Sequence, residues 1–193
     1  MRFAHFLLLA WFMFAACSVH AKESSVYVSL SAPFCMTPPH PVASFYHARS
    51  LEVAECRFRA RFRSLPLHLY VVSSDERSWI DLRAGKTIWS SEDEVVYEKE
   101  NQFGHFPNVG KAPAEIWTNP HGVASGMIFR VTAQSPDATL SAGGVSNISR
   151  LFVLGFRESG ICFLGLARSN QAARGLLAKR TSCKRMLKEE LLQ

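Results

Sequence analysis

The segment 56–63 constrains the fold of this chain most strongly, because it reads Cys-Arg-Phe-Arg-Ala-Arg-Phe-Arg. Successive side chains of a β-strand point to opposite faces, whereas a helix would scatter both residue types around its axis. The alternation predicts a strand that buries one set of residues, namely Cys56, Phe58, Ala60 and Phe62. The opposite face would expose guanidinium groups about 6.6 Å apart, on Arg57, Arg59, Arg61 and Arg63.

This arginine row has three interpretations. Arginine binds phosphate and carboxylate groups through two parallel hydrogen bonds, so an exposed row predicts an anion-binding face. The segment 92–100 carries glutamates with the same period of two, at positions 92, 94, 98 and 100. If that segment is a strand near the arginines, the two rows would pair across the sheet, and the arginines would be structural. We favour pairing, with anion binding as the functional alternative and plain solvation as the third.

The N-terminus has the features of a secretory signal. Arg2 supplies a positive start, and residues 6–16 form an uncharged apolar run. This run has the length of a signal-peptide core and is too short to span a bilayer, which needs about 20 residues. Val19 and Ala21 place small residues at the two positions that a signal peptidase reads.

We therefore expect a signal peptide at residues 1–21 and a single exported domain, periplasmic or secreted, at residues 22–193. The alternative is a lipoprotein, cleaved before Cys17 and anchored through that residue. Lipidation at Cys17 would then be the only attachment to a membrane that we expect, because no later segment approaches transmembrane length.

The cysteine content agrees with export. Four cysteines follow the predicted signal, namely Cys35, Cys56, Cys162 and Cys183. They allow three disulfide connectivities. We favour the two local bonds, Cys35 to Cys56 and Cys162 to Cys183, each worth about 3 kcal/mol in the chain-entropy account. No two of these cysteines have the close spacing of a structural zinc site, so no metal and no cofactor are expected.

The chain is basic, with 22 Lys and Arg residues against 16 Asp and Glu residues. A basic exported protein suggests an anionic glycan, an anionic lipid or an acidic envelope protein as partner, although modest charge also serves solubility. Nucleic acid is not expected as the natural partner of an exported protein.

Hydrophobic patterning predicts an α+β fold. Two apolar arms, residues 151–156 and 161–166, flank Glu158-Ser159-Gly160 and predict a hairpin covered on both faces. Residues 170–192 read as a helix that Ser169 or Asn170 could cap. We expect a single antiparallel sheet with this C-terminal helix packed on it, joined by two disulfides.

No catalytic motif is present. Residues 122–126 read Gly-Val-Ala-Ser-Gly, with the serine one position late for a nucleophile elbow. Residues 104–111 resemble a phosphate-binding loop but have one residue too many between the glycines, and Ala112 stands where Ser or Thr is required. Catalysis would need a site assembled from distant residues.

The segment 101–113 is expected to be a loop, because glycine and proline recur in it. Phe103, His105 and Phe106 form a candidate contact patch for a partner protein. We expect a non-catalytic exported protein that binds an envelope or extracellular partner. An inhibitor or immunity-type protein against an enzyme of the same compartment is the alternative, and a hydrolase with a dispersed site is the second alternative.

Overall fold

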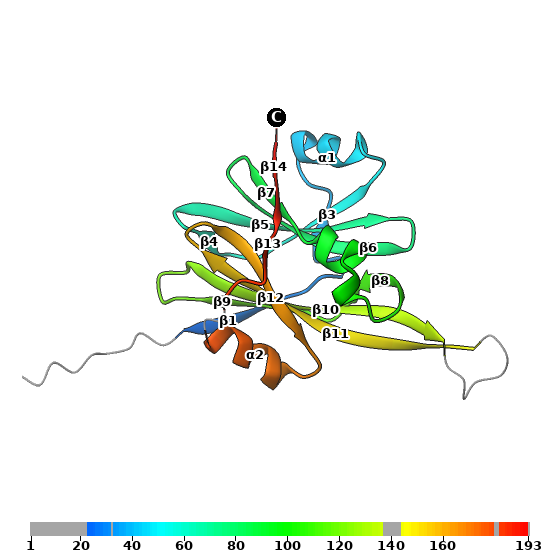
Figure 1. The fold of residues 1–193 in the computed structure, drawn as a ribbon. Helices are drawn as coiled ribbons and strands as arrows, with labels where there is room; N and C mark the ends of the chain where they lie inside the picture. The colour runs from blue at the N-terminus through cyan, green and yellow to red at the C-terminus, as the bar shows by residue number, and fades with distance from the viewer. Residues whose placement is uncertain (1–22, 32, 137–143, 180–181, 193) are drawn as a thin grey trace, which may run out of the picture.

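The computed structural model describes residues 23–31, 33–136, 144–179 and 182–192. The predicted signal peptide, including Cys17, lies outside these residues. Within them the chain forms two antiparallel sheets that lie one above the other, with a helix on the outer side of each (Figure 1). None of the described helices has the length and apolar character needed to cross a membrane.

Sheet A has the strand order β1-β9-β10-β11-β12-β13, and β8 pairs with β10 beyond the end of β9. Its strands are β1 Ser24–Val28, β8 His105–Val109, β9 Ala114–Thr118, β10 Ala124–Pro136, β11 Val145–Arg157, β12 Gly160–Ala167 and β13 Arg185–Met186.

Sheet B has the strand order β14-β7-β6-β5-β3-β2, and β4 also pairs with β5. Its strands are β2 Cys35–Met36, β3 Glu52–Cys56, β4 Arg61–Phe62, β5 Leu65–Ser74, β6 Arg77–Ala84, β7 Thr87–Ser90 and β14 Lys188–Leu191. The expected antiparallel pairing is confirmed, but the expectation of a single sheet is wrong. Alternating apolar residues indicate which segments are strands, whereas the choice of neighbours depends on contacts distant in sequence.

The main core lies between the sheets. Met127, Phe129 and Val131 of β10 contact it, together with Phe152 of β11 and Phe163 of β12. The intervening residues of the same strands face a second, smaller cluster beneath α2. The predicted hairpin is therefore present as β11 and β12, and both of its faces are covered.

Helix α2 (Asn170–Ala178) is capped by Ser169, whose Oγ accepts a hydrogen bond from the Ala172 amide at 3.2 Å. The predicted helix over residues 170–192 is correct only in this first part. Beyond it, β13 pairs with β12, and β14 pairs with β7. Helix propensity is a weak preference, and pairing with two available strands overrides it here.

The segment 92–100 is not a strand, contrary to the prediction. Residues Asp93–Tyr97 form a π-helical turn, η1, and residues Lys99–Asn101 form a 3₁₀ turn, η2. Glu94 is 2% exposed, because its carboxylate accepts hydrogen bonds from Arg185 at 2.7 Å and from Asn101 at 2.6 Å. The turn allows this inward orientation, which a strand with all its glutamates on one exposed face would not.

Both favoured disulfides are present in the structure, Cys35 to Cys56 between β2 and β3, and Cys162 to Cys183 between β12 and the segment before β13. Two disulfide bonds fit an exported protein. The second bond fastens the chain between α2 and the C-terminal strands to β12 of sheet A.

Candidate anion-binding groove

The arginine segment is interrupted as a strand. Cys56 pairs with Leu69 at the end of β3, and Arg61 pairs with Pro66 at the start of β4. The four residues 57–60 therefore face only Leu67 and His68 of β5. Four residues do not fit in the space of two, so the segment bends away from the sheet. We call residues 57–60 the arginine arch.

The predicted alternation of faces nevertheless holds through this segment. Cys56 and Phe62 are 2% and 4% exposed, and Phe58 and Ala60 are half-buried against the core. The four arginines between and after them are exposed. Burial of the apolar side chains preserves the period of two even where the ladder of hydrogen bonds is broken.

A groove of about 720 Å³ lies beside the arch. Its apolar lining includes Phe58, Ala60 and Leu67, and its basic lining consists of Arg57, Arg59 and Arg61. Glu55 and His68 also line it, as does Gly122 of the turn after β9. The groove thus combines an apolar surface with three guanidinium groups.

The groove arginines form no ion pair with a carboxylate of the described residues. Arg57 donates to Met36 Sδ at 2.9 Å, and Arg61 donates to the carbonyl of His121 at 2.5 Å. Arg59 has no side-chain partner in the described part of the chain. The expected pairing with the acidic segment 92–100 is wrong, because Glu92 pairs with Arg49, and Glu94 and Glu98 pair with Arg185.

Arg63 differs from the other three arginines. Its φ of 56° turns the chain between β4 and β5. Its guanidinium donates to the carbonyl of Glu158 and lies over the Phe62 ring, 5.0 Å from the ring centroid. Arg63 is therefore placed outside the groove, between sheet B and the β11–β12 turn.

Sequence reasoning missed the carboxylate beside the groove. Glu55 Oε1 lies 2.6 Å from His68 Nδ1, and the His68 ring stacks on Tyr70 with centroids 6.4 Å apart. The Tyr70 hydroxyl in turn accepts a hydrogen bond from Arg83 Nε at 2.8 Å. Burial raises the pKa of Tyr70, which keeps this hydroxyl protonated. Only the pairing of β3 with β5 brings Glu55 and His68 together, and no local sequence signal could have indicated it.

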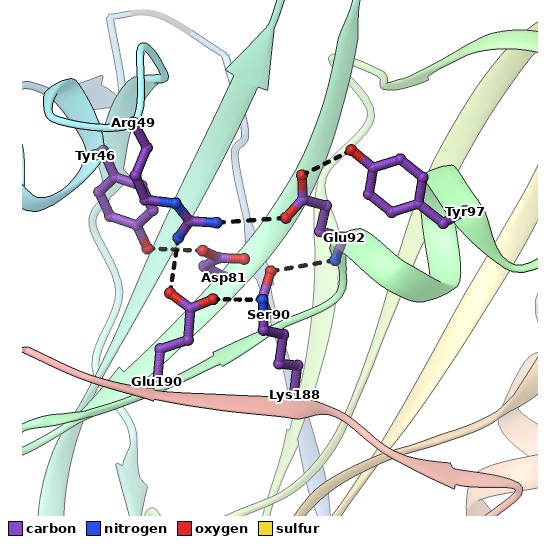
Figure 2. A network of polar contacts seen from close by, with 8 residues as sticks. All are labelled: Tyr46, Arg49, Asp81, Ser90, Glu92, Tyr97, Lys188 and Glu190. Atoms are coloured by element: carbon purple, nitrogen blue, oxygen red, sulfur yellow. Dashed lines mark hydrogen bonds and ion pairs between the residues drawn. The ribbon is translucent and has the colours of Figure 1, made fainter.

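A second polar cluster joins α1 (His40–His47) to the outer side of sheet B (Figure 2). The hydroxyl of Tyr46 donates to Asp81 Oδ2 at 2.7 Å. Arg49 donates to Glu190 at 2.7 Å and lies 3.7 Å from Glu92, while Lys188 lies 3.0 Å from Glu190. These contacts fasten α1 and η1 to strands β6 and β14 of sheet B, which indicates a structural role.

Asp81 is the most perturbed group of this cluster. It is 2% exposed, and burial raises its pKa to about 7, although hydrogen bonds from Ser90 and Tyr46 act in the opposite direction. A carboxyl with such a pKa could transfer protons near neutral pH. At 2% exposure, however, this carboxyl is covered by its neighbours, among them Tyr46 of α1, and is not open to a substrate in this structure.

The predicted loop patch is divided between core and surface. Phe103 is half-buried against Phe152, with ring centroids 6.4 Å apart, whereas His105 and Phe106 are exposed at the start of β8. The chain passes directly over β10 at Gly104, where a Cβ would lie 2.5 Å from the Gln134 carbonyl oxygen. The expected loop over residues 101–113 thus includes a strand.

Among the described residues, no group of three or more His, Cys, Asp or Glu side chains could hold a metal ion. Comparison with protein-family models, with curated proteins and with solved structures gives no match. The functional conclusion therefore depends on the groove itself.

Proposed function

We propose that this chain is an exported, non-catalytic protein that binds an anionic envelope or extracellular partner through the arginine arch. The observation that carries the proposal is the placement of Arg57, Arg59 and Arg61 along one groove without a carboxylate partner of their own in the described chain. Uncompensated guanidinium groups around a concave surface attract anions, and their planar geometry suits phosphate and carboxylate oxygens.

The backbone of the arch supports the same proposal. The amides of Phe58, Arg59 and Ala60 have no acceptor among the described residues, because the ladder to β5 is broken there. Backbone N–H groups without an acceptor in the described chain are available to water or to an anionic ligand. The arch therefore offers main-chain donors between its charged side chains.

Replacement of Arg59 and Arg61 by glutamine should weaken binding of a sulfated heparin-type oligosaccharide about tenfold at low salt, since two exposed charge contacts are lost. Affinity is measured by isothermal titration calorimetry at two salt concentrations. The double variant Arg168→Gln, Lys184→Gln is the matched control, because it removes two exposed charges outside the groove. Equal losses in both double variants would mean that net charge alone, and no specific groove, accounts for binding.

A protein partner that docks on the segment around β8 is the second candidate, and it would fit an inhibitor. The specific observation is Phe106, which is 42% exposed and held at a φ of 49° with Arg77 5.9 Å from its ring centroid. Exposed aromatic residues are frequent anchors of protein interfaces.

If Phe106 anchors a protein partner, Phe106→Ser should abolish salt-resistant capture of a single protein from envelope extract. Lys111→Ser, also exposed and a few residues further along the chain, is the control and should leave capture intact. Capture that survives Phe106→Ser would exclude this surface.

A further inference from the structure

We propose that the natural ligand of the groove is a single-chain lipid with a phosphate headgroup. This inference deepens the proposed function and rests on it, because it assigns the chemistry of the anion that the arch would hold. The inference is based on the lining of the groove, which has two parts. We call Phe58, Ala60 and Leu67 its apolar floor, and Arg57, Arg59 and Arg61 its basic rim.

Two side chains of the floor, Phe58 and Ala60, are half-buried and would stay partly in contact with water beside a purely polar ligand, whereas Leu67 is only 4% exposed. Phe58 and Ala60 point from the arch toward the core but remain half-buried, and Leu67 lies opposite them on β5. The arch contacts β5 at Ala60, whose carbonyl accepts a hydrogen bond from the Leu67 amide at 3.0 Å, and it bends away from β5 between Cys56 and Ala60, which leaves Phe58 half-buried. An alkyl chain placed here would remove apolar surface of both protein and ligand from water.

The rim favours a phosphate. A phosphate monoester carries between one and two negative charges near neutral pH and offers three strong acceptor oxygens. Arg59 has no side-chain partner in the described chain, and Arg61 uses one Nη to bind the His121 carbonyl. Two guanidinium groups beside one groove therefore offer more donors than one carboxylate needs and suit the three oxygens of a phosphate.

The dimensions of the groove favour one chain. Its volume of about 720 Å³ falls within the range of small-molecule sites, roughly 300–1,000 Å³. Glu55 lines the groove too, and its Oε1 lies 2.6 Å from His68 Nδ1. These features distinguish the site from a flat basic surface, which would hold a polymer along its length.

The test is calorimetric titration of the disulfide-bonded protein with dodecyl phosphate below its micelle concentration. Inorganic phosphate, laurate and dodecyl maltoside are titrated in parallel. Dodecyl phosphate should bind about 100-fold more tightly than inorganic phosphate, through burial of a few methylene groups. It should also exceed laurate about tenfold, and dodecyl maltoside should not bind measurably.

Two variants address the floor without changing charge. Phe58→Ser should lower the affinity for dodecyl phosphate about tenfold, and Ala60→Leu, which fills the groove and keeps an apolar side chain against the core, should do the same. In both variants the loss of affinity for dodecyl phosphate should exceed the loss for the sulfated oligosaccharide, which has no alkyl chain to bury. Leu191→Ser removes an exposed apolar side chain outside the groove and is the matched control.

The outcomes separate this inference from the proposed function. If the oligosaccharide still requires Arg59 and Arg61 but dodecyl phosphate binds no better than inorganic phosphate, the lipid inference is wrong and the anion-binding proposal stands. Equal binding of dodecyl maltoside would also overturn it, because the headgroup would then contribute nothing. If neither the oligosaccharide nor the phosphates bind, both proposals fall.

Discussion

Raising the pH from about 4 to about 8 should lower the free energy of unfolding by about 4 kcal/mol through Asp81 alone. Burial raises the pKa of this carboxyl from 3.8 to about 7. The folded protein therefore binds a proton that the unfolded chain has released between these two values. Stability from this group is complete below about pH 4 and is lost as the pH rises through about 7. Burial also raises the pKa of Glu92, which adds to the same trend.

The Asp81→Asn variant isolates this effect. Its amide can still accept the hydrogen bond of Tyr46 but cannot ionise, so most of the dependence on pH between about 4 and 8 should disappear. Urea unfolding at several pH values measures the slope. Asp75→Asn is the matched control, because Asp75 lies exposed in the β5–β6 turn. A wild-type slope retained in Asp81→Asn would show that the carboxyl is not buried in this way.

Removal of either disulfide by paired alanine substitution should destabilise the protein by about 3 kcal/mol. Both bonds join cysteines 21 residues apart, so the chain-entropy contributions are equal. Thermal unfolding of each double variant and of the parent measures the loss. A much smaller loss in one variant would indicate that its loop remains ordered in the unfolded chain.

The two variants should differ in binding, although they match in loop length. Cys56 directly precedes the arginine arch, and its disulfide bond to Cys35 holds this end of the arch to β2. Loss of this bond should weaken oligosaccharide binding about tenfold, since the arch then pays a larger ordering cost. The bond between Cys162 and Cys183 fastens a distant part of sheet A. The variant that lacks this bond should therefore bind the oligosaccharide normally at temperatures where it is folded. Equal binding by both would mean that β3 and β5 alone fix the arch.

Several elements could be predicted because their signals are local. The β11–β12 hairpin follows from two apolar runs around a short turn, and the start of α2 follows from a serine that can cap it. The two disulfides are the favoured local ones of three possible connectivities, and each joins cysteines 21 residues apart. In each case the residues that determine the structure are near one another in sequence.

The predictions that failed involve long-range competition. Residues 92–100 alternate like a strand, but Glu94 finds Arg185 and Asn101 only when the chain turns inward. The C-terminal residues favour a helix by composition, but β14 finds an open edge at β7. In both cases a partner distant in sequence supplied more stabilisation than the local preference.

The sequence by itself determined which side chains of the arginine segment are buried and which are exposed, because burial of Cys56, Phe58, Ala60 and Phe62 requires only the period of two. Tertiary structure alone decided that the segment bends into an arch, since the mismatch of four residues against two depends on how β3, β4 and β5 pair. It also decided that the glutamates of residues 92–98 pair with Arg49 and Arg185 and leave the arch without a carboxylate partner in the described chain. Pairing partners are set by the free energy of the whole fold, which no single segment contains.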